Sequence, residues 1–373
     1  MAATTTSPRR IRVVFCWTDV SGYMAACWRA LAKRPGLEVH VLHPELLLRA
    51  NPFRRDGDLL HDVSNEQFDT GARDIDRRLR DAVVAKRPDV VVICGWLYWP
   101  YTKLAQANEL RHAKVIVGMD SPWRGTLTQR LARFRLAGVI RRLNGMVTSG
   151  ERSRQYARRL GVPEHRIRTG YYGFDYESYR SVAVGRSSQP GEWPRQFLYV
   201  GRYVPAKDLA TLAAGYSEYR RAVTSPWGLT CCGWGDEARF LKDVPGLVDA
   251  GFTPPSRLAE TFSRHGAFVL PSKFEPWGVV VAEAAAAGLP VICTTACGAG
   301  DDLVRDYYSG ITVAPGDASG LARAMRWIHE HEDQLPVMGQ RGSAMSEAFS
   351  AESWAAKWHE HFLDTLVDRP SQP

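Results

Sequence analysis

The sequence predicts an α/β protein made of two doubly wound parallel-sheet units. Short apolar runs alternate with longer helix-compatible stretches, the alternation pauses near the middle of the chain, and it then restarts. Alternation of this kind is typical of βαβ units. The chain is 373 residues long, which suits two domains of average size.

The first half of the chain contains five predicted strands and at least one clear helical pattern. The strands are predicted at Arg12–Cys16, Glu38–Leu42, Asp89–Cys94, Lys114–Val117 and Gly145–Thr148. The third run is apolar throughout, as expected for a strand covered on both faces. A helix is predicted at residues 75–85, ahead of Pro88. We expect this Rossmann-like domain to span residues 1–180.

The pause falls at residues 176–194, where the stretch from Ser181 to Trp193 is rich in Ser, Gly and Pro and predicts a linker. A second Rossmann-like domain is expected over residues 195–350, with strands at Gln196–Val200, Leu229–Cys232, Ala267–Leu270 and Pro290–Cys293. The final helix is predicted at residues 351–366, where Trp354 and Trp358 lie one turn apart on the same face.

The composition favours a protein of the cytoplasm. Hydrophobic residues make up 45% and charged residues 24% of the chain, which is ordinary for a soluble globular protein. No apolar run is long enough to cross a bilayer. The seven scattered cysteines give no disulfide framework, which favours a reducing compartment. No GxGxxG, P-loop or GxSxG motif occurs, which counts against dehydrogenases, kinases and hydrolases.

The stretch from Phe274 to Ala284 carries the strongest chemical signal. It opens a predicted helix, and Gly278 lets a bound anion approach the backbone closely. The free amides from Val279 onward and the helix dipole favour a phosphate there. Glu275 and Glu283 would lie about 12 Å apart along a fully helical segment. One carboxylate could therefore bind the sugar of a diphosphate-linked donor, and the other its ribose.

A second loop that could bind a ligand is Gly201–Asp208, which follows the predicted strand ending at Val200. Arg202 and Lys207 are expected at the carboxyl edge of the sheet, where ligands of open α/β sheets bind. Two cations at this edge can neutralise a departing diphosphate without a metal ion.

These residues together resemble the paired-glutamate motif of the retaining GT-B glycosyltransferases of family 4. The motif residues are Glu275, Gly278 and Glu283, preceded by the phosphate-binding arginine and lysine, Arg202 and Lys207. The segments Tyr172–Asp175, Gly298–Val304 and Gly310–Asp317 also look like parts of that family. The resemblance covers residues 170–330 well and the N-terminal half in outline.

The resemblance implies a GT-B fold, in which two Rossmann-like domains face each other across a cleft and the last helix crosses back to the N-terminal domain. It implies transfer of a sugar from a nucleoside diphosphate sugar, with retention at the anomeric carbon and without a cofactor or metal. The N-terminal domain would hold the acceptor, which is a glycan, a glycolipid or another small molecule, as in bacterial surface polysaccharide or glycoconjugate biosynthesis.

The resemblance also implies a role for each site residue. Glu275 would orient the sugar and Glu283 the ribose, while Arg202 and Lys207 would stabilise the leaving phosphate. The rest of the expected donor site is formed by Gly278, Val279, Trp277, Gly201 and Gly22.

The N-terminal half departs from the family pattern at two places. The Gly-Gly turn after the first strand is represented only by Ser21 and Gly22. Met119 stands where the family often has a histidine, and an acidic residue, Asp120, follows it. We therefore expect Asp120 to supply the polar catalytic group on this side of the site.

Two other functional classes remain open. One is different GT-B chemistry, such as that of a sugar-nucleotide epimerase or a phosphorylase, and the other is a non-catalytic nucleotide-sugar-binding protein. The sequence Asp74-Ile75-Asp76 imitates a metal-binding DxD motif, but it lies in an arginine-rich helical pattern and is expected on a solvated face. The sequence His359-Glu360-His361 lacks the HExxH spacing of zinc sites and is also expected on an exposed helix surface.

The formal charge of +8 is concentrated in one segment, Arg124–Arg168, which contains twelve arginines and two glutamates. Leu127, Leu131 and Phe134 share one helical face, and Leu136, Val139, Ile140 and Leu143 share the opposite one. A helix here therefore either breaks near residues 136–138 or packs on both sides.

The arginine-rich segment is either a solvated face or a surface for an anionic partner. That partner is an acidic acceptor or acidic lipid, the latter making the protein peripheral on the inner face of a membrane. Nucleic acid is not expected, because no aromatic platform accompanies the arginines.

Overall fold

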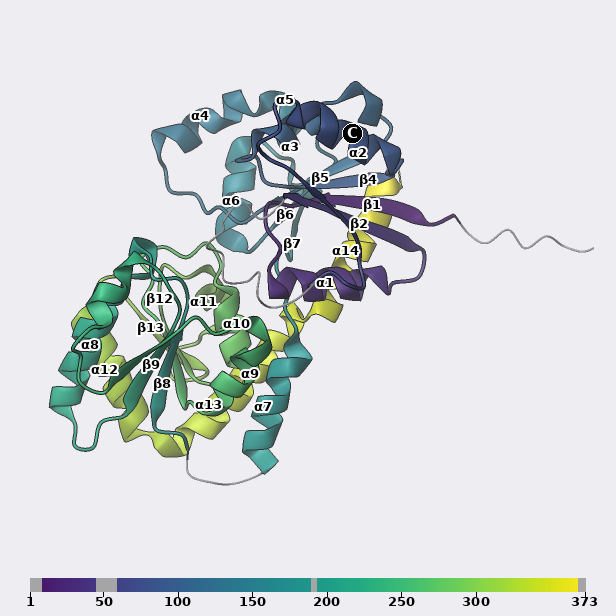
Figure 1. Ribbon diagram of the computed structural model, residues 1–373. Helices are drawn as coiled ribbons and strands as arrows, with labels where there is room; N and C mark the ends of the chain where they lie inside the picture. The colour runs from purple at the N-terminus through teal and green to yellow at the C-terminus, as the bar shows by residue number, and fades with distance from the viewer. Residues whose placement is uncertain (1–8, 45–58, 189–192, 368–373) are drawn as a thin grey trace, which may run out of the picture. The chain divides into compact units, whose positions relative to one another are not determined.

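The computed structural model describes residues 9–44, 59–188 and 193–367. The chain folds into two compact units (Figure 1). The N-terminal unit comprises the described residues up to Gly173 together with those from Ala351 onward, and the C-terminal unit runs from Phe174 to Ser350. Each unit contains a parallel sheet of the doubly wound type, so the predicted fold class is confirmed.

The N-terminal sheet has the strand order β3-β2-β1-β4-β5-β6-β7, and its pairings are parallel. The order reverses between β1 and β4, which creates the topological switch point of a doubly wound sheet. The strands are β1 (Ile11–Cys16), β2 (Leu37–Pro44), β3 (Ser64–Phe68), β4 (Val90–Cys94), β5 (Lys114–Met119), β6 (Gly145–Thr148) and β7 (Ile167–Thr169).

Alternate side chains of these strands supply two hydrophobic cores, one on each face of the sheet. Val13 and Phe15 of β1 face one core, and Val14 and Cys16 face the other. The first core is closed by α1 (Gly22–Ala32) and α14 (Ala351–Leu366). The second is closed by α2 (Ile75–Ala85), α3 (Trp99–Leu104), α4 (Leu127–Arg135), α5 (Ala137–Arg142) and α6 (Glu151–Leu160).

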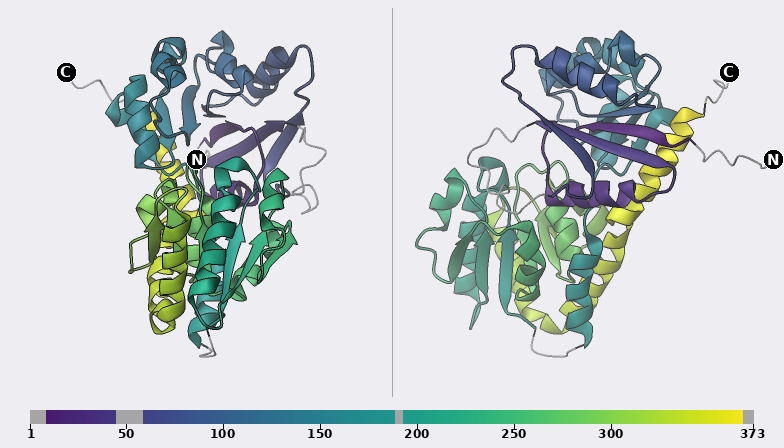
Figure 2. Two further views of the ribbon diagram at one scale, coloured as in Figure 1. Left: turned by 90° about the vertical axis from the view of Figure 1, so that its left-hand side faces the viewer. Right: turned by 45° about the vertical axis from the view of Figure 1, so that its right-hand side comes forward.

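The last helix, α14, belongs to the N-terminal unit although it follows the C-terminal unit in the chain, as expected from the GT-B resemblance. It lies along α1 (Figure 2). Trp354 and Trp358 are buried, and their indole N–H groups donate 3.0 Å hydrogen bonds to the carbonyls of Tyr171 and Gly170. The two indoles also pack on Phe15 of the central strand. The return of the helix is therefore fixed by both apolar burial and directional bonds.

The C-terminal sheet has the order β10-β9-β8-β11-β12-β13, again with parallel pairings. Its strands are β8 (Gln196–Val200), β9 (Gly228–Cys232), β10 (Leu247–Gly251), β11 (Ala267–Leu270), β12 (Val291–Thr294) and β13 (Gly310–Val313). One face is covered by α8 (Leu209–Ala222) and α12 (Ala318–Glu330) (Figure 1). The other carries α7 (Tyr176–Ser188), α9 (Pro255–Ser263), α10 (Val279–Ala286) and α13 (Leu335–Ser346), while the short α11 (Gly298–Leu303) follows β12.

The structure differs from the sequence-based expectation at the predicted linker. Residues 176–188 form helix α7, and the boundary between the units falls at residues 173–174 instead of at residues 181–193. Tyr176 and Tyr179 of α7 are buried in the C-terminal unit, and Arg186 donates to the carbonyls of Phe262 and His265. The small and polar residues of this stretch do not indicate a helix. The helix forms because its few large residues are anchored by tertiary contacts.

Strands β3, β7 and β10 also escaped prediction. Strand β3 has the sequence SNEQF and is almost entirely exposed, so it has no apolar alternation to detect. Strand β7 has only three residues, and the middle of β10 is exposed. These strands lie at the sheet edges, where pairing with one neighbour holds a strand that its own side chains would not specify.

Candidate functional site

The carboxyl edge of the C-terminal sheet brings together most of the predicted donor residues. The strand order reverses between β8 and β11, so the loops after these two strands flank the switch point, where open α/β sheets bind ligands. The loop after β8 carries Arg202 and Lys207, and the loop after β11 carries Glu275 and Gly278.

Hydrogen bonds tie these two loops to each other. The carbonyl of Ala206 accepts from the backbone amides of Lys273 at 2.9 Å and Phe274 at 3.2 Å. Asp208 adopts the left-handed φ of 55° at the start of α8, is 2% exposed, and accepts from Lys273 Nζ at 2.9 Å. It also accepts from Thr211 Oγ1 at 2.6 Å. The backbone geometry of the site is therefore held independently of any ligand.

Lys207 and Glu275 form an ion pair across the two loops. Their side chains are 15% and 12% exposed, so the pair is largely shielded from water. An ammonium group has three donors, so Lys207 can keep Glu275 and still bind a second anion. Arg202 is exposed beside them, and its carbonyl accepts from the Tyr199 hydroxyl at 3.1 Å. Gly201, just before it, lies so close to Tyr199 that a Cβ there would sit 3.0 Å from the Tyr199 hydroxyl.

Gly278 ends the β11 loop in a conformation that favours glycine, with a φ of +94°. A Cβ at this position would lie 3.0 Å from Glu275 Cγ and 3.1 Å from Cys297 Sγ. Helix α10 begins directly afterwards, at Val279, and its first-turn amides have no acceptor within the helix. Because Glu275 precedes this helix, the spacing of about 12 Å expected for a fully helical segment does not apply.

Trp277 is the expected donor residue that lies between Glu275 and Gly278. Its side chain is 3% exposed and packs on Phe349, with the ring centroids 5.2 Å apart. Its carbonyl accepts from Ala299 N at 2.8 Å and Cys297 Sγ at 3.2 Å. Trp277 therefore anchors the loop that carries Glu275 and Gly278, because apolar burial outweighs exposure of a large indole.

Glu283 has a different environment from Glu275. It lies inside α10, is 8% exposed, and forms a side-chain hydrogen bond with Tyr179 of α7. The pKa of the Glu283 carboxyl is raised to about 7: burial raises it most, the Tyr179 hydroxyl partly offsets the shift by donating to the carboxylate, and the charge of Asp175 adds to it. The two predicted glutamates thus have separate partners, one a cation and the other a phenol.

The remaining predicted residues, Asp120 and Gly22, belong to the N-terminal unit. Asp120 follows β5 at the carboxyl edge of that sheet and accepts a 2.9 Å hydrogen bond from the Tyr172 hydroxyl. Met119, before it, is 3% exposed and packs in the core. Gly22 is the first residue of α1, after the Ser21 cap that accepts from Met24 N at 3.4 Å.

Of the two sequence motifs considered as metal sites, one lies at the start of a helix and the other reaches the core of the N-terminal unit. Asp74 caps α2 and pairs with Arg77 and Arg78 at 2.6 and 2.8 Å, as expected of a solvated helix face. His361 is only 7% exposed, contrary to the expectation of an exposed surface, because α14 turns this residue toward Gly145 of the sheet. Within the described residues, no cluster of three His, Cys, Asp or Glu side chains could hold a metal ion.

Sequence reasoning missed three residues that support the site: Tyr179, Asp208 and Lys273. Asp208 and Lys273 lie in the same two loops as the predicted residues Lys207 and Glu275. Their positions in the sequence could therefore have identified them as site residues. Tyr179 had no such signal, because it lies in the stretch expected to be a linker and meets Glu283 only through tertiary packing.

Family models match both units. Residues 20–173 match the model described as "Glycosyl transferase 4-like domain", and residues 186–345 match "Glycosyl transferases group 1". A glycogen synthase of Mycobacterium tuberculosis is 29% identical over 256 residues, which cover 65% of this chain and 60% of that protein. A D-inositol 3-phosphate glycosyltransferase of Streptomyces coelicolor is 35% identical over 242 residues, which cover 57% and 53%. The chain thus spans between half and two thirds of the length of these relatives.

Solved structures are similar over almost the whole chain. Sucrose-phosphate synthase from Thermosynechococcus elongatus has a TM-score of 0.75 at 18% identity, covering 96% of this chain and 100% of that one. Anabaena Alr3699/HepE in complex with UDP-glucose has a TM-score of 0.73 at 15% identity, covering 95% and 100%. At these identities the likeness establishes the fold.

Proposed function

We propose that this chain, which joins two glycosyltransferase domains in the GT-B fold, transfers a sugar from a nucleoside diphosphate sugar to an acceptor with retention at the anomeric carbon. The observation that carries the proposal is the shielded Lys207–Glu275 pair, which lies at the switch point beside the Gly278 turn. The complex of HepE with UDP-glucose, a protein of the same fold, supports a nucleotide-sugar donor.

In this proposal the loops after β8 and β11 bind the diphosphate. Lys207 and Arg202 contribute the cations, while Gly278 and the first amides of α10, from Val279, contribute close backbone donors. The bond between the anomeric carbon and the phosphate oxygen breaks with its electrons leaving on the phosphate. Positive charge placed at that oxygen therefore stabilises the transition state more than the bound donor, and this lowers the barrier. The same two cations make a metal ion unnecessary.

Glu275 and Glu283 divide the ends of the donor between them. Glu275, which Lys207 holds in place, would accept hydrogen bonds from the sugar hydroxyls. Glu283 would accept from the ribose hydroxyls once its carboxyl is ionised, with Tyr179 keeping the carboxylate oriented. A buried carboxylate that has only a phenol for a partner gains more from two hydroxyl donors than an exposed one would.

The acceptor side belongs to the N-terminal unit. Asp120 lies at the carboxyl edge of its sheet and is oriented by Tyr172, so it is placed to accept a proton or a hydrogen bond from an acceptor hydroxyl. We propose a glycan, a glycolipid or another small hydroxyl compound as acceptor, in bacterial surface polysaccharide or glycoconjugate biosynthesis. The seven free cysteines support a cytoplasmic location.

A direct test begins with thermal-shift measurements on the full chain against UDP-, GDP- and ADP-sugars. A donor at a hundred times its dissociation constant should stabilise the folded protein by about 2.7 kcal/mol. The stabilising donor is then supplied with candidate acceptors, and NMR of the product reports the anomeric configuration. Activity should survive EDTA. An inverted product would refute retention, and loss of activity in EDTA would refute metal independence.

The same experiment separates the alternative functions. A phosphorylase would require inorganic phosphate, and an epimerase would change the sugar without releasing the nucleoside diphosphate. A non-catalytic binding protein would show the thermal shift and no turnover with any acceptor. Each of these outcomes would replace the proposal of sugar transfer.

A further inference from the structure

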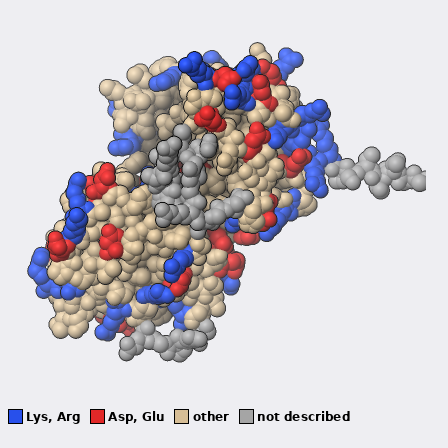
Figure 3. Space-filling model, in the orientation of Figure 1, with Lys and Arg blue, Asp and Glu red and all other residues tan. Residues whose placement is uncertain are grey.

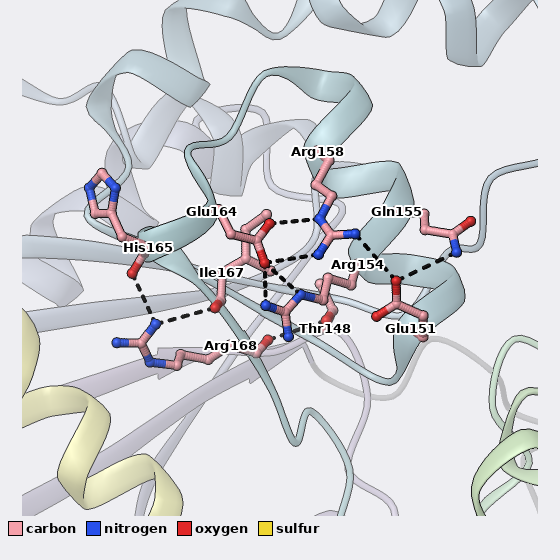
Figure 4. A network of polar contacts seen from close by, with 9 residues as sticks. All are labelled: Thr148, Glu151, Arg154, Gln155, Arg158, Glu164, His165, Ile167 and Arg168. Carbon is pink, nitrogen blue, oxygen red and sulfur yellow. Dashed lines mark hydrogen bonds and ion pairs between the residues drawn. The ribbon is translucent and has the colours of Figure 1, made fainter.

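The arginine-rich segment of the N-terminal unit divides into two parts with different partners. In the later part, Glu164 accepts from Arg154 Nε at 2.9 Å and from Arg158 Nε at 2.6 Å (Figure 4). These guanidinium groups hold the pKa of Glu164 at about 2, below its usual value. Arg168 donates to the carbonyls of His165 and Ile167. This part of the positive charge is therefore used within the protein.

The earlier part contains no acidic residues of its own. Residues 121–150 contain six arginines and neither Asp nor Glu. The helix breaks at Leu136, which ends α4 and precedes α5, as one of the two sequence alternatives required. Leu136 and Val139 pack in the core, whereas Arg130, Arg133 and Arg135 of α4 are exposed.

Helix α4 turns its apolar face outward. Leu127, Leu131 and Phe134 are 76%, 63% and 76% exposed, and their spacing of four and three residues places them in one row along the helix. Ala132 is the buried residue of this helix, on another face. An amphipathic helix of a globular protein ordinarily buries its apolar face, so this orientation is reversed.

Arginines border the exposed row on both sides. A step of 100° per residue places Arg130 on one side of the row and Arg135 on the other. The guanidinium of Arg135 lies over the Trp99 ring, 6.0 Å from its centroid, and joins α4 to α3. Trp99 is 45% exposed, and Leu97 beside it is 93% exposed. Figure 3 shows blue side chains among the tan surface over this part of the unit.

The charge pattern selects among the possible partners of this face. A second copy of the chain would bring arginines against arginines, which is repulsive. A soluble acidic molecule would pair with the arginines but would leave the apolar row in water. An anionic bilayer meets both requirements, because its phosphates lie at the level of the guanidinium groups and its acyl chains lie just below.

We propose that α4 is a peripheral membrane-binding helix, in which Leu127, Leu131 and Phe134 enter the headgroup–acyl boundary of an anionic bilayer while Arg130 and Arg135 pair with lipid phosphates. Within the described residues no helix is long and apolar enough to span a bilayer, so attachment through α4 is peripheral. This inference goes beyond sugar transfer and does not depend on it.

The test is co-sedimentation of the full chain with phosphatidylcholine vesicles, with and without a third of phosphatidylglycerol. We expect recovery with the anionic vesicles only, and weaker recovery as salt is raised. The triple variant Leu127→Gln, Leu131→Gln, Phe134→Gln should lose at least about tenfold in vesicle affinity. The double variant Arg130→Gln, Arg135→Gln should lose about fivefold for each arginine.

Matched controls come from the C-terminal unit. Arg323 and Arg326 of α12 are 67% and 50% exposed, and Val248 of β10 is 59% exposed. Replacing these residues with Gln should leave vesicle affinity unchanged, and thermal unfolding verifies that each variant is folded. Equal recovery with neutral and anionic vesicles would overturn the proposal, as would equal losses in the control variants.

Two further measurements separate other outcomes. Light scattering reports whether the wild type self-associates, and a dimer that the triple variant abolishes would assign the face to a second copy instead. Nucleotide release with a soluble acceptor should be the same in the α4 variants and the wild type. Failure of the proposed sugar transfer would appear in that assay, whereas failure of the membrane proposal would appear only in vesicle recovery.

Discussion

The two sheets of this protein have the same strand-order pattern, but the loops at their carboxyl edges carry different chemistry. In the C-terminal unit the switch point is lined by charged residues that pair with one another, Lys207 with Glu275 and Lys273 with Asp208. At the carboxyl edge of the N-terminal sheet, Asp120 is held by Tyr172, next to the aromatic side chains of Trp17 and Tyr171. The same strand order thus carries paired charges at the edge of one sheet and a carboxylate bonded to a phenol at the edge of the other.

Two buried groups, one in each unit, respond to pH with opposite signs. In the N-terminal unit burial lowers the pKa of His361 to about 4, so the folded state favours the neutral ring. In the C-terminal unit burial raises the pKa of Glu283 to about 7, so the folded state favours the protonated carboxyl. Acid therefore removes the stability that the neutral His361 contributes to the first unit, whereas rising pH between about 4.5 and 7 removes the stability that the protonated Glu283 contributes to the second.

The largest effect is expected when the charge of Glu275 is removed from the carboxyl edge of the C-terminal sheet. Replacement of Glu275 with Gln keeps the size of the side chain but leaves Lys207 without its anion, so both the sugar contact and the position of the lysine are lost. We expect nucleotide release to slow by about a thousandfold. The exposed Glu260 of α9, changed to Gln, is the control. A Glu275→Gln enzyme as fast as the control would remove the residue from the site.

The second effect tests the acid response of the N-terminal unit. The pKa of His361 is lowered from 6.5 to about 4, which corresponds to about 3 kcal/mol of stability present above pH 6.5 and lost as the pH falls toward 4. Neither ring nitrogen has a hydrogen-bond partner among the described residues, so Leu can replace the ring without loss of a bond.

Thermal unfolding between pH 7 and 4.5 measures this effect. The midpoint of the His361→Leu variant should fall less steeply with acid than that of the wild type. His112, which is exposed, provides the control when changed to Leu. Parallel acid profiles for wild type and His361→Leu would contradict the assignment of the acid response to this histidine.

The third effect concerns Asp120, the proposed contact of the acceptor hydroxyl at the carboxyl edge of the N-terminal sheet. Asp120→Asn keeps an oxygen acceptor for the Tyr172 hydroxyl and removes only the charge. Because a hydrogen bond to a charged group contributes about 1.5–3 kcal/mol, we expect turnover with acceptor to fall by about ten- to a hundredfold. Binding of the donor alone should stay unchanged. Asp81, which is 64% exposed on α2, is the matched control.

The smallest effect sharpens the description of Glu283. The Tyr179 hydroxyl lowers the pKa of that carboxyl by donating to it, so Tyr179→Phe should raise the pKa further. Since donor binding needs the carboxylate, its affinity should increase through a midpoint near pH 7 in the wild type and about one unit higher in the variant. Calorimetric titration at several pH values measures both midpoints.

A matched control lies on the same helix. Tyr176 is also buried in α7, but its hydroxyl donates to the carbonyl of Ser343 at 3.3 Å instead of to Glu283. Tyr176→Phe should leave the pH midpoint of donor binding in place. If the two tyrosine variants shift the midpoint equally, the effect comes from general loosening of α7 and not from the hydrogen bond.

The sequence by itself determined the parallel-sheet architecture, because continuous apolar runs such as Val90–Cys94 alternate with helix-compatible stretches, as in βαβ units. It also located Lys207, Glu275 and Gly278, since loop residues directly after strands of a doubly wound sheet meet at one edge. The two-sided apolar pattern around Leu136 left two alternatives, a helix packed on both sides or a break, and the structure has the break between α4 and α5.

Only the tertiary structure decided which residues these segments meet. The helix at residues 176–188 exists because its tyrosines are buried by neighbouring elements, and it alone brings Tyr179 to Glu283. Burial likewise packs the side chain of Trp277 on Phe349, and it places His361, expected on a helix surface, in the core. Periodicity and spacing describe one segment at a time, whereas burial and pairing depend on the free energy of contacts between segments far apart in the chain.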